Sequence, residues 1–165
     1  MSGRLAGTGA WPGHAPGAIG LVLCLLLAAC GDAVPEPVQP VPPPVATVEL
    51  EGPLRVHYNL LPTLALGEAV AREYGVERSD GTALLVLALR RPTADGDETM
   101  AEGQVDAEVV DLSGRRQAVA LRPVATGDYT DHVGTVKIGP RDTLRVEVVV
   151  AADGRRQRFD FQRSF

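Results

Sequence analysis

The chain has 165 residues, a net charge of −5 at pH 7, and two cysteines, Cys24 and Cys30. After Cys30 it carries 15 basic and 21 acidic residues, which is a balance of −6. Nucleic acids and anionic lipid surfaces both require a basic face on the protein that binds them. The composition therefore argues against either as an electrostatic partner.

Residues 18–29 form an uncharged, mostly apolar run. At about 1.5 Å per residue, a helix of this length falls well short of the roughly 30 Å hydrocarbon core of a bilayer. The run instead matches the apolar part of a secretory signal peptide, which we place over residues 1–29.

The four residues that end this run, Leu27-Ala28-Ala29-Cys30, resemble the lipobox of bacterial lipoproteins. The resemblance implies cleavage before Cys30, a diacylglycerol on its thiol and an acyl chain such as palmitate on the new amino terminus. Several acyl chains together make a firm membrane anchor. The alternative is an ordinary signal peptide with a chance cysteine. If the lipobox is used, no thiol remains for a disulfide, a metal site or a nucleophile.

Residues 30–45 then predict a tether. Six of the fifteen residues from 31 to 45 are proline, a composition that excludes a helix and favours extended polyproline II. At ~3.1 Å per residue the segment reaches about 45 Å. We interpret it as a semi-rigid spacer between the membrane and a folded domain. The alternative is a ligand for a proline-binding domain.

Residues 46–165 are predicted to form one domain, because their length supports a single core. Apolar residues alternate with a period of two, which indicates strands at 54–60, 83–89, 104–112, 117–123, 132–138, 143–150 and 158–165. Residues 63–75 predict one or two helical turns that end at Gly75. The polar stretch 93–103 predicts a disordered loop.

Short strands separated by turns such as Asp153-Gly154 are typical of an all-β fold. We expect an immunoglobulin-like antiparallel β-sandwich of seven or eight strands with one short helical segment. A small β-barrel is the alternative.

Several short motifs occur in order along this domain, and together they resemble the bacterial envelope family called domain of unknown function 4426. The matching pieces are Val56-His57-Tyr58-Asn59, Val70-Ala71, Tyr74-Gly75-Val76, Arg78-Ser79 and Ala83-Leu84-Leu85. The resemblance covers nearly all of residues 50–165. It implies a periplasmic β-sandwich, and it transfers no catalytic residue.

The residues offer little support for catalysis. Ser79, Ser113 and Ser164 are the only serines after Cys30, and none lies in the Gly-x-Ser-x-Gly context of a nucleophile elbow. Asp106 and Glu108 share one strand face, as solvated carboxylates do. No Gly-rich loop precedes a helix, so nucleotide binding is unsupported. We therefore expect a protein that is not an enzyme and has no cofactor.

A metal site is a weaker possibility. His57 and His132 are the only histidines after Cys30, and nothing in their spacing brings them together. We expect His57 to point outward from its strand and His132 to lie near a strand end. A site that uses His57 or His132 would have nitrogen and oxygen ligands.

His57, Tyr58 and Asn59, with the helical fragment that follows, are the best candidates for a functional surface. The alternative is structural, with Tyr58 in the core. We expect a lipid-anchored periplasmic module, on the outer membrane by default or the inner membrane, that binds another envelope protein. The alternative function is a periplasmic protein that handles a small ligand or a metal.

Overall fold

The computed structural model describes residues 45–165. The predicted signal peptide, the lipidation site Cys30 and most of the tether lie outside the described residues. Within residues 45–165, no helix is long and apolar enough to cross a bilayer.

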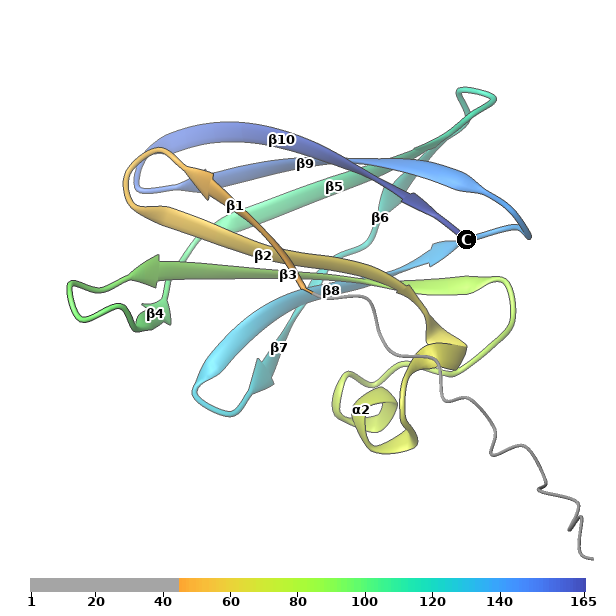
Figure 1. Ribbon diagram of the computed structural model, residues 1–165, viewed down its shortest axis with the longest axis horizontal. Coiled ribbons are helices and arrows are strands. Elements are labelled where there is room, and N and C mark those ends of the chain that lie inside the picture. Colours follow the sequence, from red (N-terminus) through yellow and green to blue (C-terminus); the bar gives the residue numbers. More distant parts are fainter. Residues whose placement is uncertain (1–44) are drawn as a thin grey trace, which may run out of the picture. The chain divides into compact units, whose positions relative to one another are not determined.

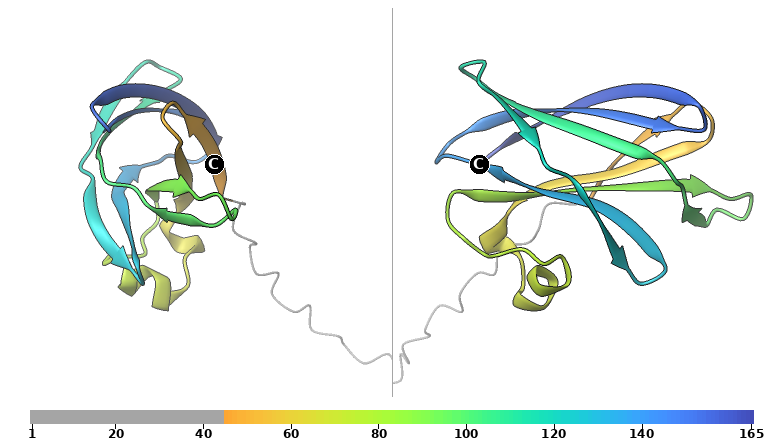
Figure 2. Two further views of the ribbon diagram at one scale, coloured as in Figure 1. Left: turned by 90° about the vertical axis from the view of Figure 1, so that its left-hand side faces the viewer. Right: turned by 180° about the vertical axis from the view of Figure 1, so that it is seen from behind.

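The described residues form two antiparallel sheets that face each other (Figures 1 and 2). The first, sheet A, has the order β1-β2-β3-β8-β7, and the short β4 pairs with β3. Its strands are β1 (Ala46–Leu50), β2 (Leu54–Pro62), β3 (Thr82–Pro92), β4 (Glu98–Met100), β7 (Arg122–Thr126) and β8 (Tyr129–Lys137). The second, sheet B, has the order β10-β9-β5-β6. Its strands are β5 (Gln104–Asp111), β6 (Arg116–Val119), β9 (Thr143–Ala152) and β10 (Arg155–Ser164).

The core lies between the sheets because alternate residues of each strand point inward. Buried positions follow this alternation closely in β9, where Leu144, Val146, Val148 and Val150 face sheet A. In β3 both faces are buried. Leu85, Leu87 and Leu89 face the main core, whereas Leu84 belongs to a second apolar cluster on the outer face of sheet A. The apolar run in β3 is therefore explained by burial on both sides.

The second cluster exists because a helical segment covers part of the outer face of sheet A. A 3₁₀ turn, η1 (Thr63–Ala65), leads into α2 (Glu68–Glu73), which lies on the side of sheet A away from sheet B (Figure 1). Leu66 and Ala71 pack there against Leu61, Leu84 and Val133. The helix ends before Gly75, whose φ of 59° is the left-handed conformation that favours glycine after a helix.

The prediction of an antiparallel sandwich with one short helical segment is confirmed, and the barrel alternative is wrong because the sheets stay separate. The expected number of strands is too low, since residues 45–165 contain ten. The predicted strand 117–123 is in fact two strands, β6 in sheet B and β7 in sheet A. The predicted disordered loop contains β4, which pairs with the end of β3.

Candidate functional site

A groove runs along the outer face of sheet A beside α2, with a volume of ≈ 390 Å³. Its walls are mainly apolar side chains of β2, β3 and the helical segment, including Leu61, Leu66, Leu84 and Val86. Two rim residues are exposed, Val45 at 62% and Val70 at 39%. A ligand or partner side chain that entered the groove would meet these surfaces first.

Alternate residues of β2 point to the outer face of sheet A, and this alternation brings part of β2 to the groove. His57 and Asn59 border the groove, and His57 pairs in register with the outward-facing Ala88. Tyr58 also borders the groove, but its ring centroid lies 4.4 Å from that of Phe161 and 5.4 Å from that of Phe159. The Tyr58 ring therefore contributes to the core, and the predicted surface is reduced to His57 and Asn59.

His57 belongs to a chain of polar contacts across three strands. Its Nε2 lies 2.7 Å from Oε2 of Glu98, and its Nδ1 lies 2.9 Å from the hydroxyl of Thr47. Arg55 donates to both Glu98 and Glu49, at 2.6 Å and 2.5 Å. Burial disfavours the charged form of Glu98, but the hydrogen bonds from Arg55 and His57 outweigh it and lower the pKa of the carboxyl group.

The polar end of the groove contains a buried ion pair. Arg90 Nη2 donates to Oδ1 of Asp131 at 2.7 Å, and the two side chains are 11% and 9% exposed. The other oxygen of Asp131 accepts from Tyr74 at 3.3 Å and from Thr126 at 3.1 Å. The guanidinium carbon of Arg90 lies 4.4 Å from the centroid of the Tyr129 ring. Every charge in this cluster is thus matched within the protein.

Tyr74 links the ion pair to the helical segment. Its partial burial, and then the negative charge of Asp131, raise the pKa of the phenol to about 12. The hydroxyl group is therefore protonated at neutral pH, and its proton is donated to Asp131. Sequence patterns alone do not identify Arg90, Asp131 and Tyr74 as neighbours, because they come from three elements that only the sheet pairing brings together.

His132 lies apart from the groove. It pairs in register with Leu87, which faces the main core, whereas His57 pairs with Ala88, which faces outward. The two histidines therefore lie on opposite faces of sheet A. Burial lowers the pKa of His132. Within residues 45–165, no group of three or more His, Cys, Asp or Glu side chains is placed to hold a metal ion.

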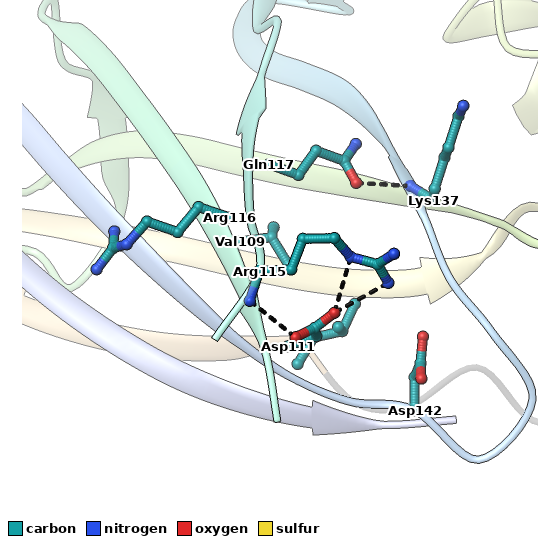
Figure 3. Close-up of a pocket in the computed structure, with 8 residues that line it drawn as sticks. Val109, Asp111, Arg115, Arg116, Gln117, Lys137 and Asp142 are labelled. Atoms are coloured by element: carbon teal, nitrogen blue, oxygen red, sulfur yellow. Dashed lines mark hydrogen bonds and ion pairs between the residues drawn. The ribbon is translucent and has the colours of Figure 1, made fainter. Parts of the chain in front are cut away.

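A second cavity, of ≈ 370 Å³, lies where β5 and β8 end and β6 and β9 begin (Figure 3). Arg115 contacts Asp111 through its backbone N–H and its guanidinium group, at 3.0 Å and 2.9 Å. These contacts close the β5–β6 hairpin. Gln117 accepts from the backbone N–H of Lys137 at 3.3 Å, and the Lys137 side chain points away from Arg115. The polar groups here stabilise a turn and a strand contact.

The serines are likewise occupied in local hydrogen bonds. The Ser79 hydroxyl donates to Thr82 at 3.0 Å, and the Ser113 hydroxyl donates to Asp111 at 2.6 Å. The Ser164 hydroxyl lies 2.9 Å from that of Thr143. Ser79 lies in the loop before β3, Ser113 in a turn and Ser164 at the end of β10.

The fold and the groove define the chain as an open β-sandwich with a partly covered outer face. The chain belongs to the family of the domain of unknown function DUF4426, whose model matches residues 49–165. A comparison with curated proteins finds no match.

Solved structures share this fold. A DUF4426 family protein from Pseudomonas aeruginosa PAO1 is 24% identical, with a TM-score of 0.62, over 73% of this chain and 94% of that one. FetP from uropathogenic Escherichia coli strain F11 is 10% identical, with a TM-score of 0.53, over 73% and 93% of the two chains. A copper-bound variant of FetP is 11% identical, with the same TM-score, over 75% and 91%. At these identities the likeness concerns the fold.

Proposed function

We propose that this protein is a non-enzymatic binding module of the bacterial cell envelope, anchored by lipid at Cys30 on the periplasmic side, that holds another envelope protein in the groove of sheet A. The observation that carries the proposal is the groove itself. It presents exposed apolar rims at Val45 and Val70 next to a fixed set of charges. Apolar pockets with a polar border are typical of the energetic centres of protein interfaces.

The two-sheet arrangement leaves the outer face of sheet A available for such a groove. The main core is closed between the two sheets, so the outer face of sheet A is free to carry a surface of its own. The lipobox-like residues and the proline-rich segment support a tethered location. FetP, which shares the fold, was expressed recombinantly in the periplasm, and this supports a periplasmic location.

Metal handling is the other function considered from the sequence, and copper is bound to a variant of FetP. The arrangement of the histidines does not favour it here. His57 and His132 lie on opposite faces of sheet A, and both ring nitrogens of His57 already contact Thr47 and Glu98. We therefore favour partner binding in the groove over metal handling by the histidines.

The test is site-specific photocrosslinking in cells, with a photoreactive phenylalanine analogue in place of Val70. The control carries the same analogue at Asp160, which lies exposed on β10 of sheet B. We expect one envelope protein to crosslink at position 70 but not at position 160, and the yield to fall in Cys30→Ser. Equal labelling at both positions, or none at position 70, would contradict the proposal.

A further inference from the structure

The groove of sheet A opens beside the point at which the described chain begins. Val45, the first described residue, lies on its rim. β1 begins at the next residue, Ala46, which pairs in register with Tyr58 of β2. β2 continues past this point to Pro62. Because the two strands are antiparallel, a chain that prolongs β1 backward from Val45 runs along the last residues of β2, toward the groove wall at Leu61.

The walls of the groove suit an occupant that is apolar and uncharged. They are formed mainly by apolar side chains such as Leu61, Leu66 and Val86. Arg90 and Asp131, which line the polar end, are paired with each other at 2.7 Å. A charged occupant would therefore lose its hydration there without gaining an unpaired counter-charge from the described lining residues.

The sequence before Val45 has this apolar, uncharged character. Residues 40–44 read Pro-Val-Pro-Pro-Pro, and residues 37–44 contain no charged side chain. A proline ring loses almost no side-chain freedom when it is buried, and proline has no backbone N–H that needs a partner. Proline-rich segments accordingly bind in grooves with aromatic walls, and Tyr74 contributes such a wall here.

We infer that residues 40–44 bind in the groove of their own chain and cover it until a partner protein displaces them. Because the segment is joined directly to Val45, its effective concentration at the groove is high, so weak contacts suffice. At ~3.1 Å per residue, five residues reach about 15 Å from Val45. Residues 31–39 are left to act as the spacer. The binding itself is independent of the proposed function, whereas the displacement rests on it.

The first test is photocrosslinking of the purified full-length protein in nanodiscs of phosphatidylcholine, with the photoreactive phenylalanine analogue at position 70. We expect crosslinks within one chain to residues 40–44, at a yield that does not depend on protein concentration. The matched control carries the analogue at Leu64, which is 50% exposed on the neighbouring η1 but does not line the groove. Absence of a crosslink to residues 40–44 from position 70, or an equal yield from position 64, would overturn the inference.

The second test is hydrogen exchange of the same protein. Replacement of residues 40–44 by Gly-Ser-Gly-Ser-Gly removes the occupant and keeps the length of the tether. We expect amides of α2 to exchange at least about threefold faster, because the occupant no longer suppresses local opening. The same replacement at residues 34–38, Val-Pro-Glu-Pro-Val, should leave this exchange unchanged. Amides of β9 should be unaffected in both variants. Equal exchange in α2 of the unmodified protein and the 40–44 variant would overturn the inference.

Photocrosslinking in cells then separates the displacement from the proposed function. The 40–44 replacement should raise the yield of the partner captured at position 70 by at least about threefold, because a larger fraction of grooves is open to the partner. A yield that is unchanged or lower would overturn the covering role of the segment but not the proposed function. Capture of no partner by either form would overturn the proposed function, and with it the displacement, but not the binding of residues 40–44 within the chain.

Discussion

Two adjacent arginines show how one strand places the same residue type in different surroundings. Arg90 points to the outer face of sheet A and is paired with Asp131 in a nearly closed environment. Arg91 points the other way and pairs with Asp153, where the side chains are 39% and 46% exposed. A buried charge must keep its partner, since removal of one leaves the other desolvated and unmatched. An exposed pair is screened by water and contributes little.

We therefore expect Arg90→Ala to lower the free energy of unfolding by about 3–5 kcal/mol. Arg91→Ala, the matched control, should lower it by no more than about 1 kcal/mol. Urea denaturation of both variants measures the difference. Similar losses for the two would show that the Arg90–Asp131 pair is accessible to solvent and is not part of a fixed polar end of the groove.

At the scale of elements, the chain crosses between the sheets from β6 to β7, and Gly134 of β8 makes room for it. A Cβ atom at position 134 would lie 2.6 Å from Cγ1 of Val119 and 3.0 Å from the carbonyl oxygen of Ala120. The backbone of residues 119–121 cannot withdraw without disturbing both strands. Gly67, at the start of α2, has nothing within 4 Å of such an atom.

Gly134→Ala should consequently destabilise the protein by about 1–3 kcal/mol, the usual cost of overpacking. Gly67→Ala, with the same chemical change in open space, should change the stability by less than about 1 kcal/mol, because the restriction of the unfolded chain is offset by the poorer capping of α2 by alanine. Thermal unfolding of the pair measures both effects. A neutral Gly134→Ala would mean that the crossing segment moves freely.

The crossing from β6 to β7 also shows which strands the sequence pattern predicts and which it misses. Alternation identifies β2, β5, β9 and β10 because each has one face toward the core. It does not divide β6 from β7, since the change of sheet leaves the alternation unbroken. It also misses β4, whose polar residues pair with β3 along the backbone and whose Glu98 side chain contacts Arg55 of β2.

The groove was predictable only in part. The orientation of His57 and Asn59 follows from strand alternation. Arg90 and Asp131 meet only because β3 pairs with β8, a long-range contact that no local pattern specifies. Glu98, a further member of the site, fell in a segment expected to be a disordered loop. Long-range pairing thus accounts for most of what the sequence alone did not reveal.

At the scale of the whole molecule, residues 45–165 share one main core to which both sheets contribute. Leu87 of β3 and Val148 of β9 are both fully buried in it. Small domains built in this way usually unfold as one cooperative unit. A loss of packing on one sheet should therefore weaken the other by the same amount.

Leu87→Ala should lower the free energy of unfolding by about 2–5 kcal/mol. Native-state hydrogen exchange should show the same loss at amides of β9 as at amides of β3. Leu64→Ala, at a leucine that is 50% exposed, should change neither. Unchanged protection in β9 of the Leu87→Ala variant would show that the sheets open independently.

The first hairpin, β1–β2, and the last strand, β10, meet at one side of the sandwich. The backbone N–H of Glu51 donates to the Gln157 side chain at 2.7 Å, and that side chain donates back to the Glu51 carbonyl at 3.0 Å. The Tyr58 ring also packs against Phe159 and Phe161 of the last strand. Contacts that span so much of the sequence slow folding, because a long loop must close before they form. A chain made from its amino terminus onward must therefore be released almost entirely before this side can close, and until then its early strands depend on whatever shields them from aggregation.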